Sequence, residues 1–210
     1  MKNLPLVLAG IVLLGACAPH LQPSLPAYMT SKKLAKPGVD LFPHCQNYDC
    51  ATVKNVGLSK ADWARIEKAY GKKAKTAEDE RVKISRAVGV FEDVLGPLTG
   101  TQNDKAGTFI QTGKGQLDCV DESTNTTIYM MLLAQKGLIT FHSIEQPQVR
   151  YPLVSGRGWM HQTAVIRDLE TGEEYAVDSW FEDNGSASYI LPIQPWMNGW
   201  HPELWEKPKN

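Results

Sequence analysis

The apolar and polar positions of the chain follow a helical period in segments between residues 58 and 137, and segments of strand composition come after them. Between residues 58 and 96, apolar side chains recur every three or four positions, as on one face of a helix. The segments SKAD at 59–62 and TAED at 76–79 are typical of capped helix N-termini. We therefore expect two helices that face a core, the second ending at the Gly-Pro pair 96–97.

A third helix is predicted after a loop. Residues 99–117 are rich in glycine and show no period, so they are expected to form the loop. Past Asp118, apolar side chains again lie on one side of a helix, and Gly137 stands where a glycine commonly ends one. Residues 138–144 then have the composition of a strand.

Two further strands are predicted to form a hairpin. Residues 162–166 and 175–180 have strand composition, and the sequence DLETGE between them offers a turn glycine. A turn centred near residues 170–171 places His161 opposite Asp178, or within about two residues of it. A histidine and an aspartate from separate strands should therefore meet on one face of the hairpin.

These elements predict a single α+β domain over residues 43–210, with a helical part at 58–96, a core at 113–181 and an aromatic tail at 190–210. The tryptophans of this tail are Trp196, Trp200 and Trp205. We expect the tail to wrap around the domain and bury its rings. Stacking on a saccharide or lying at a membrane interface is the alternative.

The first residues predict export. A lysine at position 2 precedes an apolar run that is too short to cross a bilayer, which takes about 20 residues. Residues 1–16 therefore indicate a signal peptide, and the sequence LGAC ending at Cys17 resembles a bacterial lipobox. On this interpretation Cys17 carries a lipid that anchors the protein to the outer membrane, facing the periplasm; a plain secretory signal is the alternative. Residues 17–42 would be the lipidated N-terminus and a flexible tether.

Composition narrows the possible partners only slightly. The formal net charge of -1 provides no electrostatic footprint for nucleic acid. Hydrophobic content of 42% and charged content of 21% are those of an ordinary globular protein. The chain has no HExxH motif and no EF-hand loop, and we expect neither a metal nor a cofactor.

The four cysteines each need an explanation in an oxidising compartment. Cys17 is assigned to the lipid. Cys45 and Cys50 lie five residues apart among turn formers, which allows a short local disulfide. A zinc site that includes His44 is the alternative, although the spacing is unusual and a fourth ligand is missing. Cys119 then remains as a single thiol, either buried or used.

Cysteine catalysis requires a thiol, a base and a group that orients the base. Cys119 is predicted at a helix N-terminus, where the dipole favours a thiolate and backbone N–H groups can hold an oxyanion. His161 can take the thiol proton, and Asp178 can fix which imidazole nitrogen faces the sulfur. The predicted hairpin supplies the second and third of these groups together.

This order of Cys, His and Asp resembles the transglutaminase-like branch of the papain-like cysteine enzymes. The resemblance covers about residues 113–181 and concerns spacing and context. It implies a cysteine-bearing helix packed on an antiparallel sheet, with Cys119 as nucleophile, His161 as general base and Asp178 as orienting residue.

The sequence departs from that family in two respects. Three acidic residues within 118–122 flank the thiol and oppose its ionisation, so His161 must outweigh them. No glutamine lies six residues before Cys119, where papain-type enzymes place an oxyanion donor. The backbone N–H of Cys119 with the side chain of Gln116, or else of Gln111, is the expected replacement.

Less specific interpretations of these residues remain open. Cys119 could be a buried inert thiol, His161 a surface histidine, and Asp178 a residue that only closes the hairpin. His142 could be the true partner of Cys119. In the aromatic tail, His201 is expected to be structural.

The preferred function is hydrolysis of an amide bond in a periplasmic peptide or protein, with transfer to an amine as a close variant. The alternatives are a non-catalytic envelope binding module on the same fold and a structural lipoprotein that docks a partner through its tail. Specificity should come from loops 99–117 and 145–158. Within the second loop, Arg150 and Arg157 could favour an acidic group, although solvated charges are the simpler interpretation.

Overall fold

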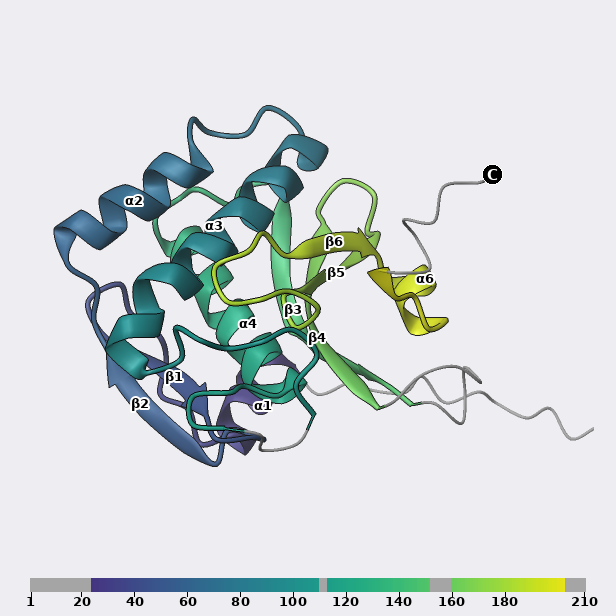
Figure 1. Ribbon diagram of the computed structural model, residues 1–210. Helices are drawn as coiled ribbons and strands as arrows, with labels where there is room; N and C mark the ends of the chain where they lie inside the picture. The colour runs from purple at the N-terminus through teal and green to yellow at the C-terminus, as the bar shows by residue number, and fades with distance from the viewer. Residues whose placement is uncertain (1–23, 110–112, 152–159, 203–210) are drawn as a thin grey trace, which may run out of the picture.

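The computed structural model describes residues 24–109, 113–151 and 160–202 (Figure 1). Its helices are α1 (Leu25–Ser31), α2 (Lys60–Tyr70), α3 (Ala77–Thr99), α4 (Cys119–Gln135) and α6 (Ile193–Met197). Its strands are β1 (Phe42–Gln46), β2 (Thr52–Val56), β3 (His142–Arg150), β4 (His161–Asp168), β5 (Glu174–Asp178) and β6 (Tyr189–Pro192). The fold is α+β, as predicted.

Two antiparallel sheets organise these elements. β1 and β2 form a small hairpin, and the larger sheet has the order β3-β4-β5-β6. The helix that begins at Cys119, α4, packs against β3, β4 and β5, while α2 and α3 pack on each other and α3 also contacts α4 (Figure 1). The expected arrangement of a cysteine-bearing helix on an antiparallel sheet is therefore present.

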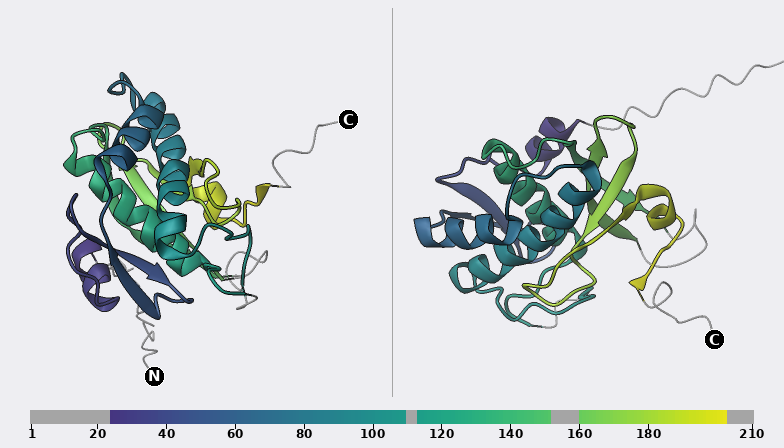
Figure 2. Two further views of the ribbon diagram at one scale, coloured as in Figure 1. Left: turned by 60° about the vertical axis from the view of Figure 1, so that its left-hand side comes forward. Right: turned by 90° about the horizontal axis from the view of Figure 1, so that it is seen from above.

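The larger sheet is covered on both faces. Because side chains alternate along a strand, Ala164 and Ile166 of β4 belong to the main core with α3 and α4, whereas Val165 faces a second cluster. This second cluster contains Trp196 and Trp200, so the described part of the aromatic tail buries its rings against the domain. Figure 2 shows the sheet between the larger helices on one side and α6 on the other.

Local capping explains where the helices begin. The side chain of Ser59 accepts a hydrogen bond from the backbone N–H of Asp62 at the start of α2, and Thr76 does the same for Asp79 at the start of α3. Gly137 adopts a left-handed φ of 69° and ends α4. These three predictions are confirmed.

The predicted end of α3 at Gly96-Pro97 is wrong, because the helix continues to Thr99 and ends at Gly100. Pro97 sits in the last turn, where it removes a single backbone hydrogen bond. Gly96 has a different role: a Cβ atom there would lie 2.7 Å from the Cα of Gln102, so the glycine allows the returning chain to approach closely.

Residues 24–42 differ from the expected tether. This segment contains α1, which contacts β3, and it buries Met29 and Leu34 in the main core. The Tyr28 hydroxyl lies 2.7 Å from the Thr124 hydroxyl of α4. The domain therefore begins before residue 43, and a seven-residue helix was too short to give a readable period.

The first strand of the larger sheet begins later than predicted. Residues 138–141 precede β3, and the carboxylate of Glu80 accepts hydrogen bonds from the backbone N–H groups of Thr140 and Phe141. These backbone groups are therefore not available to a strand ladder. A register shift follows between Glu145 and Gln148, where Pro147 has no N–H to donate.

Several predicted features lie outside the described residues, namely the signal peptide at 1–16, Cys17, Gln111, Arg157 and Trp205. Within the described part of the chain, no helix is both long and apolar enough to cross a membrane.

Candidate functional site

His161 and Asp178 meet on the predicted hairpin. Ala164 pairs with Val177, and this register puts the histidine diagonal to the aspartate on one face of the sheet. The Nε2 atom of His161 lies 2.8 Å from Oδ2 of Asp178, and the side chains are only 2% and 1% exposed. The prediction that they are neighbours is confirmed.

The hydrogen bonds of Asp178 define the tautomer of His161. The same Oδ2 atom also accepts the indole N–H of Trp196 at 2.7 Å. A carboxylate can only accept, so Nε2 of a neutral imidazole carries the proton and Nδ1 keeps a lone pair. Nδ1 is buried and has no hydrogen-bond partner among the described residues. The ring is therefore arranged to accept a proton at Nδ1.

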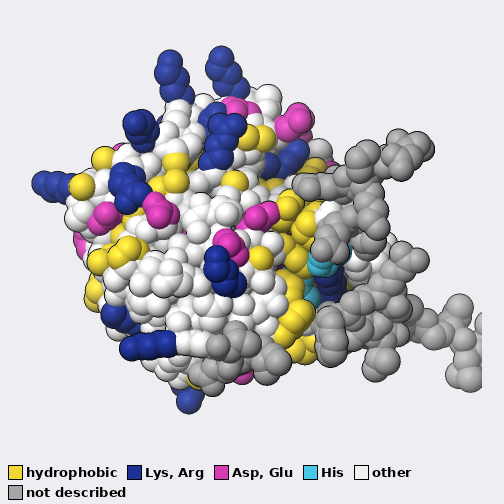
Figure 3. All heavy atoms as spheres, viewed as in Figure 1, with side chains coloured by type: hydrophobic (Ala, Val, Ile, Leu, Met, Phe, Trp, Pro, Cys, Tyr) yellow, Lys and Arg dark blue, Asp and Glu magenta, His cyan; other side chains and the backbone are white. Residues whose placement is uncertain are grey.

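Aromatic rings surround the imidazole and fix its orientation. The ring centroids of Trp180, Phe181 and Trp196 lie 4.6, 5.1 and 5.5 Å from that of His161. His201 packs in turn on Phe181 at 4.9 Å. Figure 3 shows histidine side chains at the border of a hydrophobic surface on this side of the molecule, with Lys or Arg atoms beside them.

Cys119 is the first residue of α4. Asp118 caps the helix, because its side chain accepts the backbone N–H groups of Val120 and Asp121 at 3.1 and 2.9 Å. The thiol is 6% exposed and packs with Trp180, the ring that also contacts His161. Trp180 therefore contacts both the cysteine and His161, while no hydrogen bond joins the sulfur to the imidazole among the described residues.

Burial keeps Cys119 in the neutral thiol form. Burial is the main cause, and with the negative charges of Asp118 and Asp178 it raises the pKa of the thiol to about 11, against the opposing hydrogen bond from the backbone N–H of Gln162. The helix dipole therefore does not create a resting thiolate. Any reaction at Cys119 near neutral pH has to remove this proton during the reaction itself.

The acidic residues beside Cys119 anchor a disulfide loop. Cys45 and Cys50 are bonded, which confirms the predicted disulfide and removes both sulfurs from the alternative zinc site. Asp121 is fully buried and accepts the backbone N–H groups of Tyr48 and Cys50 at 2.7 and 2.8 Å. Burial, followed by the charge of Asp118, raises the pKa of Asp121 to about 7.

Gln116 does not occupy the predicted oxyanion position. Its Nε2 atom donates to the carbonyl of Asn103 at 2.9 Å, and its Oε1 atom accepts from the backbone N–H of Lys105 and the hydroxyl of Thr108. The amide therefore holds the 103–108 loop together. Closeness in sequence to Cys119 did not indicate where the side chain points.

The alternative base, His142, belongs to another network. Its Nδ1 atom lies 2.9 Å from the Glu80 carboxylate and its Nε2 atom 3.2 Å from the Arg81 guanidinium. Burial favours a raised pKa for Glu80, but the hydrogen bonds from His142 and from the backbone hold it below its usual value. These bonds join α3 to the start of β3. Both ring nitrogens of His142 are therefore engaged, and His161 is the better candidate base for Cys119.

Two features of the site went unrecognised in the sequence. Trp196 was expected only to be buried, whereas it also binds the catalytic candidate Asp178. Arg150 was considered as a group that could favour an acid, but a solvated loop charge was preferred, whereas it is 5% exposed and lies directly opposite His161 in the β3–β4 register. The signal that could have located Arg150 is its place at the end of β3, directly opposite His161 in the strand pairing.

Comparisons of the chain with protein-family models, with curated proteins and with solved structures gave no match.

Proposed function

We propose that the protein is a thiol-dependent acyl-transfer enzyme that hydrolyses an amide bond in a periplasmic peptide or protein. The observation that carries the proposal is the buried His161–Asp178 pair, which leaves Nδ1 without a partner in an aromatic cluster whose Trp180 also packs on Cys119, the free cysteine of the described residues. The order and packing of these residues agree with a transglutaminase-like or papain-like core. The lipobox resemblance at Cys17 adds a lipid anchor in the outer membrane to the proposal.

The reaction begins with proton transfer. With a substrate bound, the Cys119 sulfur approaches Nδ1 of His161, which accepts the thiol proton as the sulfur attacks the carbonyl carbon. Asp178 stabilises the imidazolium through Nε2. The backbone N–H of Cys119, in the first turn of α4, donates to the oxyanion.

The tetrahedral intermediate then collapses to a thioester. Imidazolium returns its proton to the departing amine, and the C–N bond breaks. A water molecule gives a proton to Nδ1 as its oxygen attacks the thioester carbonyl, which releases the carboxylic acid and restores the thiol. An amine in place of water gives transfer. The raised pKa of Cys119 makes this general-base route more consistent with the structure than a resting ion pair.

The first test is the alkylation rate of Cys119 by iodoacetamide as a function of pH, in the chain from residue 18 onward. General-base activation predicts a first limb near neutral pH that depends on His161, and a second rise above about pH 10 as the thiol, whose pKa is about 11, ionises. His161→Ala should remove the first limb and keep the second. His201→Ala is the matched control and should keep both.

The contrary outcome is equally clear. If wild-type protein and His161→Ala give the same single high-pH rise, Cys119 is an inert buried thiol. The non-catalytic binding module then replaces the enzyme, because the fold and its aromatic surface remain.

A further inference from the structure

Arg150 is a buried cation opposite the candidate base, His161. It ends β3, pairs with His161 across the β3–β4 ladder, and is 5% exposed. Its Nη1 atom donates to the carbonyls of Trp196 and Trp200 at 2.6 and 3.0 Å, and its guanidinium lies 4.6 Å from the centre of the Trp196 ring. The side chain is therefore held in place by the tail that also binds Asp178.

The charge of Arg150 is not neutralised by its contacts. Carbonyl groups accept hydrogen bonds but carry no net charge, and no described carboxylate lies within ion-pair distance of the guanidinium. The buried Nε atom has no partner among the described residues. The negative charges that act on the guanidinium are those of Asp178 and of Cys119 when it is ionised.

A cation without a counter-ion is expensive to bury, and a neutral donor could serve the two carbonyls. Guanidinium groups bind carboxylates with charge-assisted and often paired hydrogen bonds. An incoming carboxylate would supply both the missing charge and an acceptor for the free donor. The position of Arg150, across the ladder from His161, puts such a carboxylate beside the reacting carbonyl.

We propose that Arg150 is a specificity-determining residue that binds a substrate carboxylate close to the carbonyl attacked by Cys119, an inference that rests on the proposed function. The substrate class is an acidic peptide or acyl group. Its carboxylate can come from an acidic side chain or from a chain terminus, and both sources share this chemistry.

The test compares two alkylating reagents that differ in charge. Iodoacetate carries a carboxylate next to its reacting carbon, whereas iodoacetamide is neutral, and both form an S–C bond with release of iodide. In the wild-type protein, the ratio of the iodoacetate to the iodoacetamide rate at Cys119 should exceed that of the denatured chain by about tenfold. Arg150→Gln should remove this excess, and Arg150→Lys should keep part of it.

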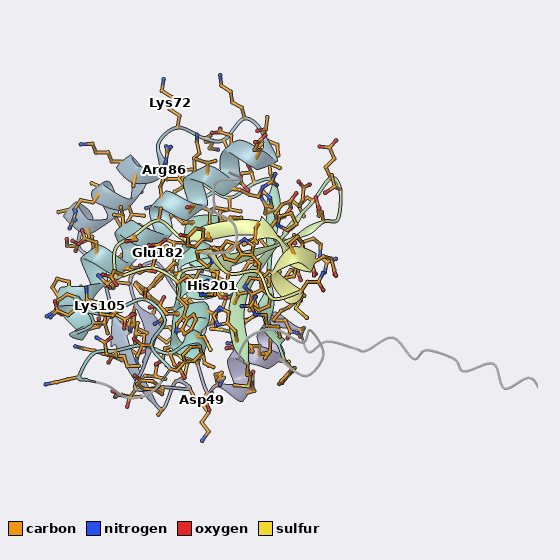
Figure 4. The ribbon with its side chains drawn as sticks, turned by 45° about the vertical axis from the view of Figure 1, so that its right-hand side comes forward. Asp49, Lys72, Arg86, Lys105, Glu182 and His201 are labelled. Atoms are coloured by element: carbon orange, nitrogen blue, oxygen red, sulfur yellow. A yellow bond between two sulfur atoms is a disulfide. The ribbon has the colours of Figure 1, made fainter. Side chains whose placement is uncertain are left out.

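Lys72→Gln is the matched control for net charge. Lys72 is exposed and extends into solvent from the loop between α2 and α3 (Figure 4). This variant should keep the wild-type ratio. A wild-type ratio equal to that of the denatured chain, or an excess that survives in Arg150→Gln, would overturn the proposal.

A wild-type measurement decides the matter if Arg150→Gln fails to fold. Three compounds are tested for protection of Cys119 from iodoacetamide. N-acetylglutamate amide carries a side-chain carboxylate, N-acetylglutamine carries a terminal carboxylate, and N-acetylglutamine amide carries none. At least one acid should protect, and which one does so identifies the source of the carboxylate. Equal protection by all three, or by none, would contradict the proposal.

The two proposals fail separately. The reagent ratio depends on the charge beside the sulfur and can be measured in His161→Ala as well as in wild type. Loss of the His161-dependent limb with the ratio intact would remove the catalytic function and keep the anion site. The reverse pattern would keep the catalytic function and remove the role of Arg150.

Discussion

At the residue scale, the chemistry of the site depends on one carboxylate oxygen. Oδ2 of Asp178 accepts from His161 and from Trp196, and this pair of bonds fixes the aspartate relative to the ring that it orients. Trp200 lies in the same cluster and is buried, but its indole N–H has no partner among the described residues. Substituting each tryptophan in turn therefore distinguishes the effect of the indole hydrogen bond from the effect of ring packing.

We expect Trp196→Phe to lower the His161-dependent alkylation rate of Cys119 by about tenfold, because Asp178 loses a hydrogen bond donated to a buried charge. Trp200→Phe removes an N–H that makes no such bond and should change this rate by less than about twofold. Rates are measured with iodoacetamide at neutral pH. Equal rates in both variants would show that the Trp196 N–H does not support His161.

Residue contacts could be predicted only where local geometry determines them. His161 and Asp178 are joined by a short hairpin, so their meeting followed from the position of the turn. Trp196 and Arg150 reach the same site from α6 and β3, and no period in the sequence specifies that docking. The raised pKa of Cys119 arises mainly from burial, which depends on the assembled fold.

At the element scale, a strained loop is attached to the N-terminus of α4. Residues 47–50 all have φ between 53° and 65°, a left-handed conformation that costs non-glycine residues energy. The carboxylate of Asp121 accepts hydrogen bonds from two backbone N–H groups of this loop, and that of Asp118 accepts one from the N–H of Asp49 at 3.0 Å. Helix and loop thus hold each other in place.

We expect Asp121→Ala to reduce the free energy of unfolding by about 3 kcal/mol, since it leaves two backbone donors unsatisfied in a buried setting. Asp62→Ala is the control, because Asp62 also accepts a backbone N–H but within the local capping box of α2, where such a loss costs about 1 kcal/mol. Urea unfolding measures both values. A smaller effect at Asp121 than at Asp62 would contradict this role of the loop contact.

The same distinction explains which elements were predictable. Helix caps involve residues three positions apart, so they could be identified in the sequence. The left-handed loop contains no glycine and depends on Asp121, more than 70 residues away in sequence. Helix α1 is stabilised by packing on β3 and was likewise invisible to local patterns.

At the scale of the whole molecule, a group of buried carboxyls connects the helices to the segment after β5. Ser179 donates to Glu122 at 2.5 Å, and the backbone N–H of Gly185 donates to Glu92 at 3.0 Å. Burial is the largest influence on all three carboxyls, raising the pKa of Glu92 to about 8, that of Asp104 to about 6 and that of Glu122 well above its usual range. The folded protein therefore holds protons here that the unfolded chain releases.

This uptake of protons sets the sign of the pH dependence. The contribution of Glu92 is fully present below its unfolded pKa near 4.5 and is lost as the pH rises toward about 8. His44 acts in the opposite direction, because burial lowers its pKa to about 3. Each group changes stability by up to about 1.4 kcal/mol per pH unit within its window. Together with Asp121, whose pKa is also raised, the three carboxyls outweigh one histidine.

We therefore expect the free energy of unfolding to be larger at pH 5 than at pH 8, by at least about 2 kcal/mol. Glu92→Gln should reduce that difference and stabilise the protein at pH 8, whereas Glu170→Gln, at an exposed position, should do neither. Urea unfolding curves at the two pH values give the result. A steeper dependence in Glu92→Gln than in wild type would show that the sign is wrong.

The two-sided cover of the larger sheet also determines when the site can exist. Cys119 begins α4, the helix that packs on one face, whereas Trp196 belongs to the cluster on the other face and follows Asp178 in the sequence. A growing chain displays its thiol, then its histidine and aspartate, well before the indole that binds Asp178. The proposed site is thus completed only after Trp196 has been added, so a shorter nascent chain lacks the hydrogen bond that this indole donates to Asp178.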